Sequence, residues 1–291
     1  MSTGKIGFLL HPGERAAIDE ALATAKRCGF ATWTALEHAD SVTAREAAGT
    51  VLLITVGGDG TFLYGARLAA PRGIPVMGVN RGRLGFLNDV ELSGLTDAIE
   101  RFAQQRYRTQ RRSLIEARIA AGGEVCTALA LNEILVRSRD ASVARLRVEA
   151  DEEVLGLFDA DGVVVSTATG STAYALSAGG PPVDPRLHAL VVVPLAPHAV
   201  ISRPLVLPDE VRVLVTVVHG RVFIAADGIS VVNAEDGGEV AIHPGPDLEV
   251  VRFSDSPSFH DRLREKFRFG VPHKDPVERL PESDRGQRDA S

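Results

Sequence analysis

The first hundred residues alternate between short apolar runs and longer stretches in which apolar residues recur every three or four positions. Three apolar runs predict strands, at residues 5–10, 51–56 and 74–80, and the second of these is expected to be fully buried. Residues 14–28 and 93–105 have the helical period, and Ser93 is the predicted N-cap of the second helix. This alternation is typical of an α/β layer with a mostly parallel sheet, so we predict a Rossmann-like α/β domain over residues 1–106.

Beyond about residue 107 the pattern changes. Short runs rich in β-branched residues follow one another, separated by Gly, Pro and Asp. Repeated short strands at this spacing predict a β-rich second domain, similar to a β-sandwich, over residues 107–255.

The helical period returns near the C-terminus. Ser256 and Pro257 are the predicted N-cap and first turn of a helix whose apolar stripe must pack on another element. We expect this helix to return to the first domain, which would then include residues 256–272; packing on the β-rich domain is the alternative. The polar residues 273–291 are predicted to be a disordered tail.

Composition limits the class of protein. The chain has 291 residues, of which 45% are hydrophobic and 24% charged, so it can bury a sizeable core. A net charge of −6 argues against nucleic acid or an anionic membrane as a partner. Cys28 and Cys126 lack the spacing of a metal site or a disulfide framework, and no apolar run approaches the length of a membrane span. We therefore expect a cytoplasmic protein.

The most distinctive short motif directly follows the predicted strand at residues 51–56. It consists of Gly57, Gly58, Asp59, Gly60 and Thr61. Glycines here allow positive φ and close approach of another group, so backbone N–H groups at a helix start can cradle a phosphate. A fixed carboxylate would repel that anion unless a cation lies between them or the carboxylate takes part in the reaction. The alternative is an ordinary strand-to-helix turn capped by Thr61.

Two adjacent polar residues, Asn132 and Glu133, interrupt the apolar run at residues 130–136. Neighbouring side chains of a strand face opposite ways, so at least one of the pair would face a buried side. An unpaired polar group there costs about 1–3 kcal/mol. An amide beside a carboxylate suits an adenine edge and a ribose diol. The alternative is that the two polar residues only mark where the chain crosses to the edge of the sheet.

Residues 159–180 are the richest in candidate ligand-binding groups. A predicted buried strand leads into a loop of small and hydroxyl residues and then into a short helical pattern. So many hydroxyl groups within nine residues exceed what one helix cap requires, although a well-capped junction is the alternative. Asp161 precedes the strand, and Gly179 and Gly180 close the unit.

These motifs, in this order, resemble those of the NAD kinase family, which transfers the γ-phosphoryl group of a nucleoside triphosphate to the adenosine 2′-hydroxyl of NAD. They are GGDGT, GRLGFL, NE, a DG followed by STATGSTAY and SAGGP, and a second DG at residues 227–228. The resemblance covers most of the chain, from about Lys5 to Phe269. It implies ATP or polyphosphate as donor, Mg²⁺ or another divalent cation held mainly by the donor phosphates, and a homodimer or homotetramer.

The resemblance also implies roles for individual residues. Asp59 would lie beside the 2′-hydroxyl and assist its attack, with Gly57, Gly58, Gly60 and Thr61 near the phosphates. The NAD site would be formed by Phe86, Asn132, Glu133, Asp161, Thr169, Ser171, Ala173, Tyr174, Ser177 and Asp227.

Two further positions bear on how NAD would be bound. The family commonly has proline where this chain has Ala168, and without that fixed φ the loop is less pre-organised. Asp159 stands at the position that in the family influences the choice between NAD and NADH, so this choice stays open.

Two other functions are compatible with parts of the pattern. Lipid kinases of the diacylglycerol and sphingosine group share GGDGT, but their NE pair typically follows the glycines closely, whereas here it comes about 70 residues later. A regulator that binds a dinucleotide without turnover is the second alternative; the presence of Asp59 argues against it.

Overall fold

The computed structural model describes residues 4–14, 18–37, 44–82, 85–140, 142–199 and 203–268. The chain divides into two compact units, Met1–Ser256 and Pro257–Ser291, and each is described by itself. The predicted tail at residues 273–291 lies outside the described residues.

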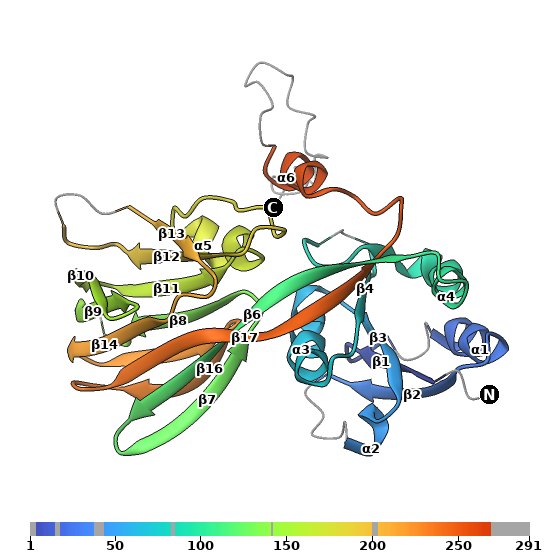
Figure 1. Ribbon diagram of the computed structural model, residues 1–291, viewed down its shortest axis with the longest axis horizontal. Coiled ribbons are helices and arrows are strands. Elements are labelled where there is room, and N and C mark those ends of the chain that lie inside the picture. Colours follow the sequence, from blue (N-terminus) through green and yellow to red (C-terminus); the bar gives the residue numbers. More distant parts are fainter. Residues whose placement is uncertain are drawn as a thin grey trace, which may run out of the picture. The chain divides into compact units, whose positions relative to one another are not determined.

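The N-terminal part of the first unit is an α/β layer (Figure 1). Strands β4, β3, β1 and β2 lie side by side in this order and are parallel. The predicted strands at residues 5–10, 51–56 and 74–80 are confirmed as β1, β3 and β4. Strand β2 was not predicted because its side chains are at most half-buried and form no continuous apolar run. The elements are β1 (Lys5–Leu10), α1 (Asp19–Arg27), β2 (Ala31–Leu36), α2 (Ala44–Ala47), β3 (Thr50–Val56), α3 (Asp59–Ala69), the 3₁₀ turn Ala70–Arg72 and β4 (Val76–Asn80).

The helix predicted after β4 begins later than expected. Strand β5 (Val90–Glu91) leads into a 3₁₀ turn, Leu92–Gly94, and then into α4 (Leu95–Ala103). The prediction of Ser93 as N-cap is wrong, since Gly94 occupies the cap position and no side chain caps the helix. A 3₁₀ turn before the first α-helical turn moves the start by two residues, which local sequence does not specify.

The second half of the first unit is β-rich, as predicted. Its strands join two sheets, and the second sheet has the order β13-β12-β11-β8-β15-β16, with every pair antiparallel. The elements are β6 (Arg108–Ala121), β7 (Glu124–Ala130), β8 (Glu133–Ser138), β9 (Ala144–Ala150), β10 (Glu153–Ala160), β11 (Gly162–Thr167), α5 (Tyr174–Ser177), β12 (Ala189–Leu195), β13 (Leu205–Pro208), β14 (Val213–His219), β15 (Val222–Ala226), β16 (Ile229–Ala234) and β17 (Glu239–Arg252).

Two long strands, β6 and β17, connect the α/β layer to the β-rich part. They pair antiparallel over most of their 14 residues, and β17 also lies parallel to β4, with Val250 opposite Val76. The first sheet therefore continues from β2 to β10 and contains 11 of the described strands. Figure 1 shows β6 and β17 running together between the two parts. The domain boundary near residue 107 stays a prediction.

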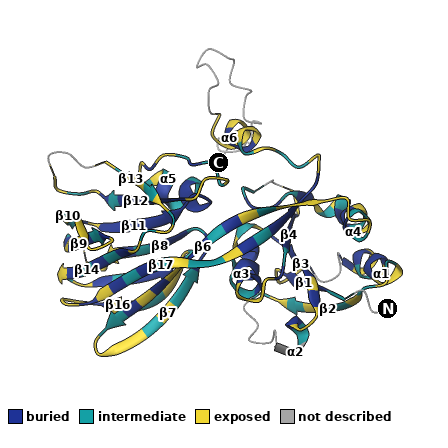
Figure 2. Ribbon diagram, in the orientation of Figure 1, coloured by how far each residue is buried: buried dark blue, intermediate teal, exposed yellow. Residues whose placement is uncertain are grey.

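The core of the β-rich part lies between the two sheets. Alternate residues of both sheets form one buried cluster, among them Ile115 and Val215 from the first sheet and Val163 and Ile224 from the second. This is the sandwich-like arrangement expected from the sequence. Figure 2 shows the central strands largely buried, while β7 carries exposed residues.

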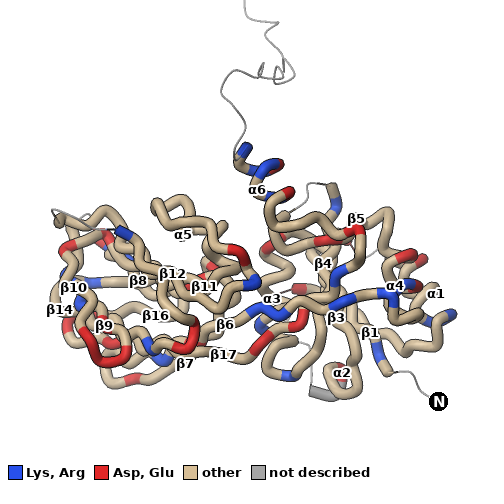
Figure 3. The backbone as a smooth tube through the Cα atoms, turned by 45° about the horizontal axis from the view of Figure 1, so that its top comes forward, with Lys and Arg blue, Asp and Glu red and all other residues tan. Residues whose placement is uncertain are grey.

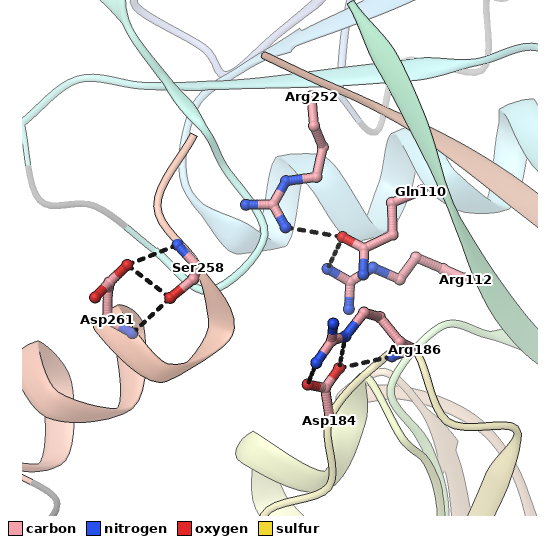
Figure 4. Close-up of polar contacts among 7 residues, drawn as sticks. All are labelled: Gln110, Arg112, Asp184, Arg186, Arg252, Ser258 and Asp261. Carbon is pink, nitrogen blue, oxygen red and sulfur yellow. Dashed lines mark hydrogen bonds and ion pairs between the residues drawn. The ribbon is translucent and has the colours of Figure 1, made fainter. Parts of the chain in front are cut away.

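The second unit contains helix α6 (Phe259–Phe267). Its N-cap is Ser258, whose hydroxyl accepts a hydrogen bond from the Asp261 N–H while the Asp261 carboxylate accepts one from the Ser258 N–H (Figure 4). The prediction of Ser256 as N-cap is wrong, because its hydroxyl instead accepts from the Phe253 N–H. The return of this helix to the first domain stays a prediction.

Two further properties concern the described chain as a whole. No helix in this part of the chain combines the length and the apolar character needed to cross a membrane. Acidic and basic residues are interspersed along the backbone in the view of Figure 3.

Candidate functional site

Several of the predicted site residues lie on segments that meet near the carboxyl ends of β3 and β4. Asp59 begins α3 directly after β3, and the segment 85–88 follows β4. Phe62 of α3, Leu87 and Leu131 share one buried cluster, which brings the turn between β7 and β8 to the same place. Three segments far apart in the sequence therefore meet through apolar packing.

The Asp59 carboxylate is held by the segment 85–88. It accepts hydrogen bonds from the backbone N–H groups of Phe86 and Leu87, at 3.1 and 3.4 Å, and from Asn88 Nδ2 at 3.2 Å. A Cβ atom on Gly85 would lie 1.9 Å from an Asp59 oxygen, so only glycine allows this approach. Three donors thus fix the orientation of a half-buried carboxylate.

The glycines around Asp59 have different surroundings. None of Gly57, Gly58 and Gly60 has a positive φ, so the expected left-handed backbone is wrong for this motif. A Cβ atom on Gly57 would lie 2.3 Å from Thr61 Oγ1, whereas on Gly58 or Gly60 it would meet no described atom within 4 Å. Gly57 therefore permits internal packing against the buried Thr61. Gly58 and Gly60 leave the backbone accessible at the N-terminus of α3, where an anion is favoured.

Asn132 lies in a turn and not inside a strand, because the predicted apolar run is split into β7 and β8. The loop after β11 packs directly on this turn. The Asn132 carbonyl accepts hydrogen bonds from the Thr167 N–H at 2.8 Å and the Ser166 hydroxyl at 3.1 Å, and the Thr167 hydroxyl donates to the Leu131 carbonyl at 2.6 Å. We call residues 131–133, which connect β7 to β8, the NE turn. The NE turn and the hydroxyl-rich loop are therefore one structural unit.

The hydroxyl residues of this loop do not share one role. The buried Ser171 hydroxyl donates to the Ala168 carbonyl at 2.7 Å and accepts from the Val183 N–H at 2.8 Å, so it stabilises the loop itself. Ala173 and Tyr174 are half-buried and Ser177 is exposed. Their contacts with NAD, like that of Thr169, stay predictions.

Two acidic residues lie away from this unit. Asp161 is exposed at the start of β11, at the end of that strand opposite the hydroxyl-rich loop. Asp159 lies on β10, where its carboxylate accepts two hydrogen bonds from Arg145, at 2.7 and 2.9 Å. Within a single chain, Asp161 therefore does not lie next to Asn132 and Glu133.

The structure places Asp227 behind the NE turn. Its side chain has no exposed area, and its oxygens accept hydrogen bonds from the backbone N–H groups of residues 131–133 and from Arg67. A direct contact of Asp227 with NAD stays a prediction, whereas its contacts within the protein are extensive.

A polar chain that the sequence did not reveal links the hydroxyl-rich loop to β17. Arg112 contacts the Thr169 hydroxyl at 3.5 Å, and both Arg112 and Arg252 donate to Gln110 Oε1 (Figure 4). Arg252 also pairs with Asp89 at 2.6 Å. No local signal distinguishes these arginines from solvated ones, because their burial results from the pairing of β6 with β17. By contrast, Asn88 directly follows the GRLGFL motif, so its place in the site could have been predicted from the sequence.

Glu133 is the most perturbed acid of the unit. Burial raises its pKa to about 7, and the negative charge of Asp227 adds to the rise, whereas the Tyr174 N–H lowers it. Its Oε2 atom is buried with no hydrogen-bond partner in the described part of the chain. Such an acceptor is suited to a ligand that brings a hydroxyl or amino donor.

The raised pKa predicts a pH-dependent stability. The folded protein holds the Glu133 proton more tightly than the unfolded chain, so the stabilisation is present below the unfolded pKa of 4.5 and is lost as pH rises through about 7. Between pH 5 and pH 8, the free energy of unfolding of the wild type should fall by about 2–3 kcal/mol more than that of Glu133→Gln. Urea unfolding at both pH values measures this difference. The exposed Glu239→Gln variant is the control and should follow the wild type; equal pH dependence of wild type and Glu133→Gln would contradict the prediction.

Comparison with known proteins gives consistent matches over both halves. Residues 15–107 match the ATP-NAD kinase N-terminal domain, and residues 131–252 match the ATP-NAD kinase C-terminal domain. An NAD kinase of Heliobacterium modesticaldum is 48% identical over 61% of this chain, and the match spans 64% of that relative, just under two thirds of its length. NAD kinases of Moorella thermoacetica and Paraburkholderia phytofirmans are 37% and 38% identical over 77% and 84% of this chain, and over 73% and 80% of their own lengths.

Solved structures show the same fold. The yeast NADH kinase complexed with NADH has a TM-score of 0.81 over 92% of this chain and 89% of its own; at 21% identity, this likeness concerns the fold alone. An NAD kinase from Archaeoglobus fulgidus in complex with ATP has a TM-score of 0.67 and 26% identity, over 90% of this chain and 97% of its own.

Proposed function

The chain belongs to the NAD kinase family, and we propose that it transfers the γ-phosphoryl group of ATP, or a phosphoryl group of polyphosphate, to the adenosine 2′-hydroxyl of NAD. The observation that carries the proposal is the Asp59 carboxylate. It lies between two glycines with accessible backbone and is oriented by three donors from the segment 85–88. A turn that only connected β3 to α3 would need neither feature.

In the proposed reaction the 2′-oxygen attacks the γ-phosphorus of ATP, and the bond from that phosphorus to its bridging oxygen breaks. The hydroxyl proton moves to Asp59. Phosphoryl transfer through a loose transition state depends on positioning and charge stabilisation, so Asp59 orients the hydroxyl and accepts its proton late. Accessible backbone N–H groups at the start of α3 stabilise the donor phosphates.

Asn132 and Glu133 are proposed to bind the adenosine half of NAD. Their backbone is fixed by Asp227 on one side and by the loop after β11 on the other. The buried, unpartnered Oε2 of Glu133 can accept a hydrogen bond from a ribose hydroxyl or an adenine amino group. The neighbouring Tyr174, Thr169 and Phe86 are proposed to complete the NAD pocket.

The residues present fit a magnesium ion bound together with the donor. Mg²⁺ in such sites takes one or two carboxylates and otherwise phosphate oxygens and water, and the half-buried Asp59 can supply one carboxylate oxygen. Bound there, the ion would neutralise charge on the donor phosphates. No group of three or more His, Cys, Asp or Glu in the described ranges is arranged to hold a metal by itself.

We also propose a homodimer or homotetramer. Strand β10 is an edge strand of the first sheet, and its Val154 and Leu157 are 55% and 58% exposed. Exposed apolar side chains on an edge strand are typical of a surface that another chain covers. Leu157→Glu is therefore expected to lower the mass measured by sedimentation velocity. The same charge at Leu187, which is 59% exposed but lies in a loop and not on an edge strand, is the control, and an unchanged mass for Leu157→Glu would exclude β10 from the interface.

The proposed function is tested by measuring NADP formation from NAD with ATP and Mg²⁺. Parallel reactions replace ATP by polyphosphate, NAD by NADH, and NAD by diacylglycerol or sphingosine. Turnover of NAD supports the proposal, and the donor arms decide between ATP and polyphosphate. NAD binding without turnover by any donor would indicate a regulator, whereas turnover of a lipid alone would indicate a lipid kinase.

A further inference from the structure

Asp227 lies in the two-residue turn between β15 and β16. Asp227 and Gly228 both have positive φ, +48° and +77°, as the tightest hairpin turns require. Aspartate followed by glycine is common in such turns because both residues tolerate positive φ. Here the carboxylate has no exposed area, so the formation of a turn does not account for it.

The Asp227 carboxylate binds the NE turn through three successive backbone groups. Its Oδ2 accepts a hydrogen bond from the Leu131 N–H at 3.0 Å, and its Oδ1 accepts from the N–H groups of Asn132 and Glu133 at 2.7 and 3.3 Å. The Asp227 N–H also donates to the Glu133 carbonyl at 3.0 Å. Both residues proposed to recognise adenosine are therefore held through their backbones by one side chain.

The same carboxylate also accepts a hydrogen bond from Arg67. Its NH1 atom lies 2.9 Å from Asp227 Oδ2, and the Arg67 side chain is 19% exposed. Arg67 lies on α3, eight residues after Asp59 and thus about two turns along the same short helix. Asp227 therefore connects the helix that begins with Asp59 to the NE turn.

A buried ion pair is a poor source of stability, because desolvation of both groups offsets much of their attraction. Three carboxylates, Asp59, Glu133 and Asp227, lie on this connected unit, so Arg67 also offsets part of their negative charge. What the pair provides is a fixed relation between two backbone segments, since a charge-assisted hydrogen bond is short and directional.

We propose that Asp227 and Arg67 are a positioning pair that fixes the NE turn relative to Asp59, and so holds the acceptor hydroxyl of the dinucleotide in line with Asp59. This inference rests on the proposed function. Neither residue contacts the reacting atoms; both act through the backbone of residues 131–133 and through α3.

The test is a double-mutant cycle with Asp227→Asn, Arg67→Met and the double variant. Each single variant should lower kcat/KM for NAD 10- to 100-fold, because misplacement of a bound substrate by about 1 Å costs this much. KM for NAD should rise and kcat should fall, whereas KM for ATP should change less than twofold. The double variant should lose little more than either single one, since both remove the same connection.

Two controls separate positioning from folding. Arg67→Lys keeps a cation that can reach Asp227 and should recover most of the activity lost in Arg67→Met. Arg72→Met removes an exposed arginine whose guanidinium donates to the Leu68 carbonyl at 2.7 Å, and this variant should stay within twofold of the wild type. Activity is compared per folded protein, with the folded fraction measured by urea unfolding.

A second readout does not depend on turnover. Hydrogen exchange at the N–H groups of residues 131–133 should accelerate at least tenfold in Asp227→Asn and in Arg67→Met, and stay unchanged in Arg72→Met. Unchanged exchange and kcat/KM within threefold of the wild type would overturn the positioning pair. If the wild type does not turn over NAD, the proposed function fails, and exchange alone decides whether the pair holds the turn.

Discussion

Asp59→Asn is expected to lower kcat for NADP formation by about 10²- to 10⁴-fold, the usual contribution of a positioned acid or base. Asparagine keeps the shape of the side chain but cannot accept the proton of the 2′-hydroxyl. Its amide would also place an N–H group against one of the donors from Phe86, Leu87 and Asn88, which now all face carboxylate oxygens. KM for NAD should change much less than kcat, because Asn132 and Glu133 are untouched.

Asp97→Asn is the matched control for this substitution. Asp97, like Asp59, is an acid in the first turn of a helix, but it is exposed on α4 and pairs with Arg101. Its replacement tests the general effect of removing a carboxylate from a helix N-terminus, and kcat should stay within twofold of the wild type. A kcat for Asp59→Asn within tenfold of the wild type would exclude Asp59 as the catalytic group.

Gly170→Ala is expected to destabilise the protein by about 3 kcal/mol, the upper range for overpacking, and to raise KM for NAD. A Cβ atom on Gly170 would lie 2.1 Å from the Asn132 carbonyl oxygen and 2.5 Å from the Asn132 Cα. Both are backbone atoms, so no flexible side chain can move away. Gly170 does not have a positive φ, and the effect therefore comes from contact alone. Separation of the loop from the NE turn would displace Asn132 and Glu133 together.

Urea unfolding and the KM for NAD measure the two consequences of Gly170→Ala. Gly94→Ala is the control, because its Cβ atom would come no closer than 3.9 Å to the nearest atom, Val90 Cγ1. Because alanine is less favourable than glycine at a helix N-cap, Gly94→Ala should cost at most about 1 kcal/mol of stability, and it should leave KM close to the wild type. A Gly170→Ala protein as stable as Gly94→Ala would mean that the loop does not pack on the NE turn in solution.

The motif residues differ in how well the sequence predicts their place in the structure. The segment around Asp59 was predictable, since an apolar run followed by glycines places a carboxylate at the carboxyl end of a strand. The positions and roles of Asn132 and Ser171 were less predictable from the sequence. Asn132 lies in a turn that splits a continuous apolar run, and the Ser171 hydroxyl serves the loop itself. Hydrogen-bond partners, which decide such roles, are not encoded in local composition.

The sequence by itself determined the α/β alternation, the change to β-rich structure near residue 107 and the motifs that mark the family. These follow from period, burial and turn chemistry, which act over a few residues. The tertiary structure decided that β17 returns to pair with β4, that Arg112 and Arg252 are buried, and that Asp227 joins Arg67 to the NE turn. Each of these depends on segments more than 50 residues apart, and only the register of paired strands and the packing between sheets bring such segments together.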